Sequence, residues 1–72
     1  MNLSEIGTLR AVDAESGDEL VAIVRGDAQN VALCLSVEKN GDVEAVFAPA
    51  DAKKLVALLQ QALAAPSAQR GR

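Results

Sequence analysis

The chain has 72 residues, half of them apolar, with a single cysteine, a single aromatic residue and no histidine. This length suffices for one domain, and the apolar content is too high for a disordered chain. The lone cysteine excludes a disulfide within the chain and, without histidine, the usual structural zinc site. Phe47 alone provides almost no platform for stacking nucleic-acid bases.

The formal net charge of −3 is unevenly distributed along the chain. Residues 1–51 contain all ten acidic residues and three basic ones, which gives −7, whereas residues 52–72 contain four basic residues and no acidic one. Proteins that bind nucleic acid directly usually present a basic face, so the acidic part argues against direct binding. The asymmetry indicates either an acidic interaction face or a set of solvated turns.

No segment carries the pattern of a membrane or export signal. The first seven residues lack a basic start and an apolar run. The best helical segment, about 49–65, is too short and too polar to cross a bilayer. We therefore expect a protein that does not insert into a membrane, in a reducing cytosol.

Turn signals divide the first 48 residues into four strand-length runs rich in Val, Leu and Ile. The signals lie at 15–18, 26–28 and 39–42, and the last contains Asn-Gly, a strong hairpin signal. The expected strands span 6–13, 19–25, 30–38 and 43–48. Because the connections are short, neighbouring strands must be antiparallel, and a four-stranded meander is predicted.

The last hairpin can be closed in two registers. A two-residue loop, Asn40-Gly41, places Val37 opposite Glu44, which mixes polar and apolar residues on one face. A three-residue loop, 39–41, with Gly41 in the left-handed conformation, places Val37 opposite Val43 and gathers the apolar residues on one face. The sequence therefore favours the three-residue loop. This choice also pairs Leu35 with Ala45 and Leu33 with Phe47.

After Phe47 the apolar period changes from two to 3.6, which predicts a helix. Pro49 suits a first helical turn, and Asp51 there is favourable to the helix dipole. Apolar residues follow on one stripe that would lie on the sheet: Ala52, Leu55, Val56, Leu59 and Leu63. The predicted fold is α+β, a four-stranded antiparallel meander followed by one C-terminal helix on one sheet face. Residues 1–65 form the single domain, and 66–72 a flexible tail.

One helix can cover only one face of such a sheet, and the other face is not clearly polar. A connected apolar set on a surface is typical of interaction sites. We therefore expect a protein interface there, with self or with a foreign partner; a small patch softened by nearby Glu and Arg is the alternative. The candidate interface residues are Val21, Ile23, Cys34, Glu38, Asp42, Glu44, Val46 and Leu58.

No motif for catalysis, a cofactor or a metal is present. Without histidine there is no side chain poised as a base at neutral pH, and Cys34 is expected to be an inert strand residue. The carboxylates of the turns would be wet, which leaves their pKa unsuited to acid–base work. The acidic cluster at 13–19 lacks the ligand spacing of a helix-loop-helix calcium site. We expect a non-enzyme without a cofactor.

Three classes of function fit these patterns. The leading hypothesis is a protein-binding module, a small acidic inhibitor that docks on a larger nucleic-acid-handling complex through charge complementarity. In size and charge alone it resembles small phage-encoded anti-defence proteins, including anti-CRISPR proteins. The alternative is a homodimeric structural or assembly accessory protein. A small-ligand carrier is disfavoured because one sheet and one helix leave little room for a pocket.

Overall fold

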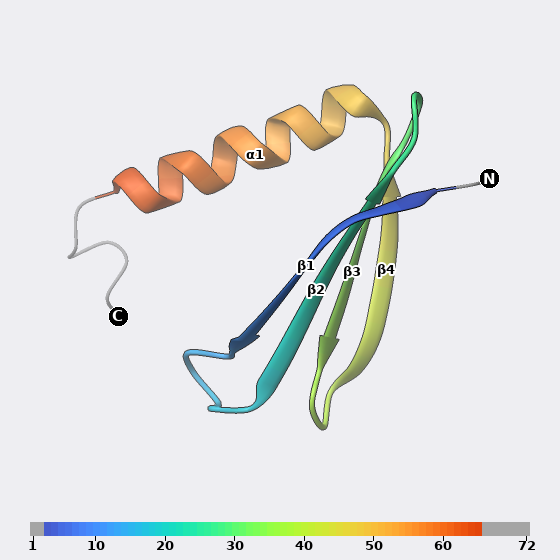
Figure 1. The fold of residues 1–72 in the computed structure, drawn as a ribbon. Coiled ribbons are helices and arrows are strands. Elements are labelled where there is room, and N and C mark those ends of the chain that lie inside the picture. The colour runs from blue at the N-terminus through green and yellow to red at the C-terminus, as the bar shows by residue number, and fades with distance from the viewer. Residues whose placement is uncertain (1–2, 66–72) are drawn as a thin grey trace.

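Four antiparallel strands and one helix make up this protein in a computed structural model that describes residues 3–65 (Figure 1). The strands β1 to β4 lie in one open sheet in the order of the chain, and α1 follows β4. The element bounds are β1 Ser4–Val12, β2 Glu19–Gly26, β3 Val31–Val37, β4 Gly41–Phe47 and α1 Pro49–Ala64. The predicted ββββα arrangement is confirmed. The tail predicted at 66–72 lies outside the described residues.

Alternation along the strands gives the sheet two chemically different faces. Residues paired across strands share a face, so each set of paired residues forms a row across the sheet. We call the face toward α1 the inner face; its central row is Leu9, Ala22, Leu35 and Val43. The opposite, outer face has a central row of Thr8, Ile23, Cys34 and Glu44. Apolar residues therefore fill the inner rows, whereas charged and apolar residues mix on the outer face.

The register predicted for the last hairpin is wrong by two residues. Val37 pairs with Gly41 and Leu35 with Val43, so the loop consists of residues 38–40. The backbone N–H of Asn40 donates to the carbonyl of Val37 (2.9 Å), and Lys39 turns the chain with φ of 74°. Gly41 does adopt positive φ (83°), but as the first residue of β4. A shift of two preserves the side-chain alternation, so the predicted inner-face set is retained.

The first strand also contains an irregularity that the sequence pattern did not reveal. Glu5 pairs with Arg25 and Gly7 with Val24, which leaves Ile6 as an extra residue in β1. Such a bulge bends the strand and increases its local twist. β1 is an edge strand, where bulges help to prevent pairing with another sheet.

The helix packs on the inner face at the end where it emerges from β4. It leaves Phe47 through Ala48, whose extended backbone (φ −64°, ψ 153°) turns the chain away from the strand direction. A cavity of about 200 Å³ remains between α1 and the sheet. Apolar side chains alone line it: Val24, Val31, Leu33, Phe47, Ala52, Leu55, Val56 and Leu59. The predicted apolar stripe therefore does face the sheet, without closing tightly on it.

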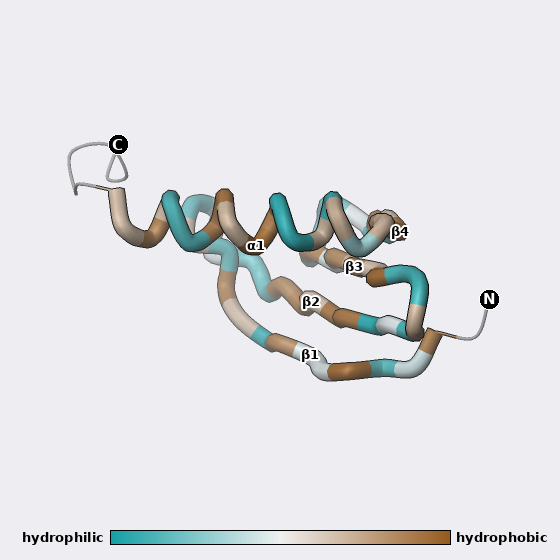
Figure 2. Tube along the Cα trace, turned by 90° about the horizontal axis from the view of Figure 1, so that it is seen from above, coloured by the Kyte–Doolittle hydropathy of each residue, from teal (hydrophilic) through white to brown (hydrophobic). Residues whose placement is uncertain are grey.

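Helix and sheet diverge beyond this contact. In Figure 1, α1 starts beside the end of β4 and runs out at an angle to the strands. In Figure 2, β1 is the strand that lies farthest from the helix. Among the described residues, Ala32 is the one apolar residue that is fully buried. The layered core expected under the helix is therefore only partly formed within one chain.

Candidate functional site

Polar contacts between side chains link neighbouring strands on the outer face, and one of them crosses β3. The guanidinium of Arg25 donates to a carboxylate oxygen of Glu44 (3.2 Å), which joins β2 to β4. Ala32, paired between Arg25 and Val46, lies in the row at this bridge, where a small side chain fits beneath the longer ones. Ser36 donates to Asp42 (2.6 Å) in another row. The Arg25–Glu44 ion pair therefore neutralises part of the charge in the middle of the face.

The acidic residues of two separate turns meet at one end of the sheet. In an antiparallel meander the β1–β2 and β3–β4 turns share an end, and the backbone N–H of Glu38 donates to the carbonyl of Glu19 (2.9 Å). The ammonium of Lys39 lies 3.8 Å from the carboxylate of Asp18. These two turns contribute six carboxylates to what we call the acidic end, defined by residues 13–19 and 38–42: Asp13, Glu15, Asp18, Glu19, Glu38 and Asp42.

Asp13 shapes the longer of these turns. Its Oδ1 accepts hydrogen bonds from the backbone N–H groups of Ser16 (2.9 Å) and Glu15 (2.8 Å). These bonds favour the ionised form, so they lower the pKa of the Asp13 carboxyl below its ordinary value of 3.8. This carboxylate therefore has a structural role in the turn and stays charged at neutral pH.

The structure places most of the predicted interface residues on one surface. Val21, Ile23, Cys34, Asp42, Glu44 and Val46 all lie on the outer face. Glu38 lies in the turn at the edge of that face, where its Oε1 accepts from the backbone N–H of Glu19 at 3.4 Å. Leu58 is separated from this set because it belongs to α1, on the other side of the sheet. The interface itself stays a prediction.

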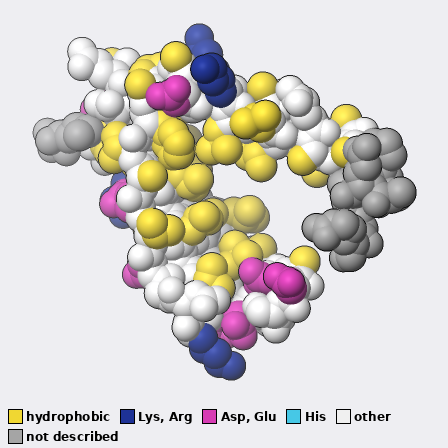
Figure 3. Space-filling view, turned by 180° about the vertical axis from the view of Figure 1, so that it is seen from behind, with side chains coloured by type: hydrophobic (Ala, Val, Ile, Leu, Met, Phe, Trp, Pro, Cys, Tyr) yellow, Lys and Arg dark blue, Asp and Glu magenta, His cyan; other side chains and the backbone are white. Residues whose placement is uncertain are grey.

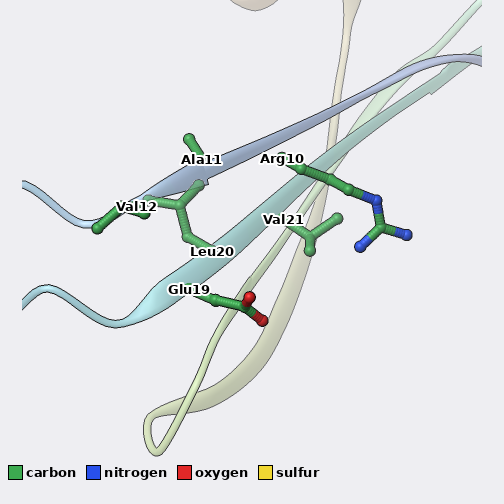
Figure 4. Close-up of a pocket in the computed structure, with 6 residues that line it drawn as sticks. All are labelled: Arg10, Ala11, Val12, Glu19, Leu20 and Val21. Carbon is green, nitrogen blue, oxygen red and sulfur yellow. The ribbon is translucent and has the colours of Figure 1, made fainter.

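A shallow depression marks the β1–β2 strand pair near the acidic end (Figure 4). It encloses about 230 Å³ and is lined by Arg10, Ala11, Val12, Glu19, Leu20 and Val21. Figure 4 shows Arg10 and Val21 projecting to one side of the strand pair and Ala11 and Leu20 to the other. The depression therefore lies at the turn end of the β1–β2 hairpin and brings no reactive groups together.

Sequence reasoning missed a second surface, the opening between α1 and the inner face. In Figure 3 the helix and the sheet form the two walls of a hollow, and hydrophobic side chains lie on both walls. On the sheet wall, Leu9 is 60% exposed and Val43 is 63% exposed. On the helix wall, Val56 and Leu59 are more than half exposed. The uncharged inner face was visible in the sequence pattern, whereas the angle of α1 was not.

Within residues 3–65 no group of three or more Cys, Asp or Glu side chains is arranged to hold a metal ion. Cys34 is a free, half-buried thiol on the outer face. In this described part of the chain, no helix combines the length and apolar content needed to cross a membrane.

The chain was compared with protein-family models, with curated proteins and with solved structures. No family model, curated protein or solved structure matches it. The function is therefore argued from two surfaces, the outer face with its acidic end and the opening between α1 and the inner face.

Proposed function

We propose that this chain is a non-catalytic protein-binding module that docks through its acidic end and outer face on a basic surface of a larger protein. The observation that carries the proposal is the meeting of two acidic turns, residues 13–19 and 38–42, beside half-exposed apolar side chains of the outer face such as Val21 and Ile23. Protein interfaces combine such an apolar centre with a polar rim.

The charge at this end supports a basic partner. Residues 13–19 and 38–42 contain six acidic residues and Lys39 as the one basic residue. A negative surface accelerates association with a positive one and disfavours other partners. Large basic surfaces are typical of proteins that bind nucleic acid. A small acidic module on such a surface blocks access of the nucleic acid, so the proposed activity is inhibition of a nucleic-acid-handling complex, of the anti-defence or anti-CRISPR type.

The first experiment tests capture and competition. The tagged protein is incubated with cell lysate, and bound proteins are identified and purified. The proposal expects a basic, nucleic-acid-binding partner whose capture falls when its nucleic acid is added in excess. Capture that nucleic acid does not reduce, or no capture at all, would contradict the inhibitor proposal.

A charge-matched pair of variants then tests the acidic end. Glu15→Gln with Glu38→Gln removes two negative charges there, and we expect the association rate with the partner to fall about tenfold at low salt. The control, Gln29→Lys with Gln61→Lys, changes the net charge equally at the β2–β3 turn and on α1. Equal slowing by both pairs would show that net charge, rather than the acidic end, governs binding.

A homodimeric assembly protein is the second candidate function, and the open inner face favours it. A chain of which Ala32 is the one fully buried apolar residue among those described leaves apolar surface for another subunit. This function would need no foreign partner. Capture without any basic partner, together with a dimeric mass, would favour it over the inhibitor.

A further inference from the structure

The inner face exposes apolar side chains where a folded monomer would bury them. Its four rows contain no charged side chain, and α1 reaches only the rows near its own origin, those of Val31 and Val24. The central row beyond them is open, with Leu9 and Val43 each about three-fifths exposed. The half of the inner face nearer the acidic end thus lacks a cover.

The accessible surface area of the chain is larger than that expected for a compact monomer of its mass. Its accessible surface is 5692 Å², whereas a folded monomer of 7.4 kDa is expected to expose about 4,200 Å². Its radius of gyration is 13.9 Å, against about 11 Å for a compact chain of this length. Over all 72 residues the chain exposes about 1,500 Å² more than a compact monomer of its mass, an excess to which the open inner face and α1 contribute.

This excess is larger than what a stable dimer requires. A standard-size interface takes about 800 Å² from each partner, roughly half of the excess. A small ligand would not account for it, because the cavity under α1 holds only about 200 Å³ and ligand pockets usually span about 300–1,000 Å³.

The two walls of the opening complement each other in a second copy. The sheet wall lacks a helix over its central row. On the helix wall, Val56 and Leu59 line the cavity toward their own sheet and are still more than half exposed. Two open angles of this kind can interlock about a twofold axis, so that each α1 lies on the inner face of the other chain.

Charge separates the inner face from the outer face as the site of self-association. The inner rows are uncharged, so two copies meet there without repulsion. The outer rows contain charged side chains, among them Arg25, Asp42 and Glu44, and burying them against a second copy would remove them from water, which opposes pairing there. We propose that the chain is a homodimer closed through the inner face and α1, with both acidic ends left exposed. This is independent of the docking proposed above, which uses the other surface.

The test is solution mass by light scattering, with two variants of the same strand. The parent chain is expected to have twice the 7.4 kDa chain mass at two concentrations about a hundredfold apart. Val43→Glu places a charge in the inner face and is expected to raise the dissociation constant about 100-fold or more. Val46→Glu places the same charge on the outer face, 48% exposed, and is expected to leave the dimer intact. A monomeric parent chain, or dissociation by Val46→Glu alone, would overturn the proposal.

A second measurement is independent of how the variants fold. Labelled and unlabelled chains are refolded together, and isotope-filtered NOEs report contacts between copies. The proposal expects such contacts between the methyl groups of Leu59 and those of Leu9 and Val43. Contacts between copies that involve Val21, Ile23 and Val46 instead would assign the dimer to the outer face and reject the inner one. Loss of partner capture with an intact dimer would reject the proposed function alone.

Discussion

Two residues at the β3–β4 turn have positive φ, Lys39 at 74° and Gly41 at 83°. This region costs a non-glycine residue about 1–2 kcal/mol, so Lys39 is strained by the turn while Gly41 is not. The turn therefore contains one strained residue, and in the register that it closes the apolar residues of β3 and β4 share the inner face.

Replacing Gly41 by alanine should destabilise the protein. An added Cβ would meet nothing within 4 Å, so the cost is conformational rather than steric. We expect Gly41→Ala to lower the free energy of unfolding by about 1 kcal/mol, measured by urea denaturation. Gly7→Ala is the control, since a Cβ there also meets nothing and φ is not positive. A loss of stability equal in both variants would contradict the role of φ.

The turn also shows where sequence reasoning fails at this scale. The pattern placed the left-handed residue at Gly41 because glycine adopts positive φ freely, and Gly41 does so. It did not place a second left-handed residue at Lys39, because a lysine seldom adopts that conformation. This second residue moved the pairing by two positions.

At the scale of the elements, the helix begins without a side-chain cap. Ala48 is the N-cap residue, and its carbonyl accepts from the backbone N–H groups of Asp51 and Ala52. Its methyl group cannot accept a hydrogen bond from the first turn of α1. The start of the helix is therefore a point where stability can be gained.

An acidic cap should stabilise α1. We expect Ala48→Asp to raise the free energy of unfolding by about 1 kcal/mol, because its carboxylate can accept from the free N–H groups of the first turn. Thermal and urea denaturation measure the change. Ala57→Asp, in the middle of the exposed helix, is the matched control and should destabilise instead. A gain in both variants would point to charge rather than capping.

Strands and helix were predictable to within about two residues because their signals are local. Alternation defines the strands, Pro49 marks the start of the helix, and the same alternation assigned six of the eight candidate residues to one face. The bulge at Ile6 left no such signal. The separation of Leu58 from the other candidates follows from α1 lying on the inner side, which its apolar stripe already indicated.

At the scale of the whole molecule, the angle of α1 could not be predicted from the sequence. An apolar stripe and an apolar face predict that helix and sheet meet, but they do not tell whether the stripe covers its own sheet or that of a second copy. After Ala48 the helix diverges from the sheet and leaves the central row of the inner face open. The core is therefore incomplete within one chain, and the apolar side chains left exposed are those that the proposed dimer would bury.

The stability of such a molecule should depend on its concentration. If the core is completed only between two copies, unfolding also separates them, and each tenfold dilution should lower the free energy of unfolding by about 1.4 kcal/mol. The midpoint of thermal unfolding, followed by circular dichroism at several concentrations, should therefore rise with protein concentration. Val46→Glu should keep this dependence, and Val43→Glu should lose it if it still folds. A midpoint that is constant for the parent chain would mean that a single copy folds alone, with its inner face open to solvent.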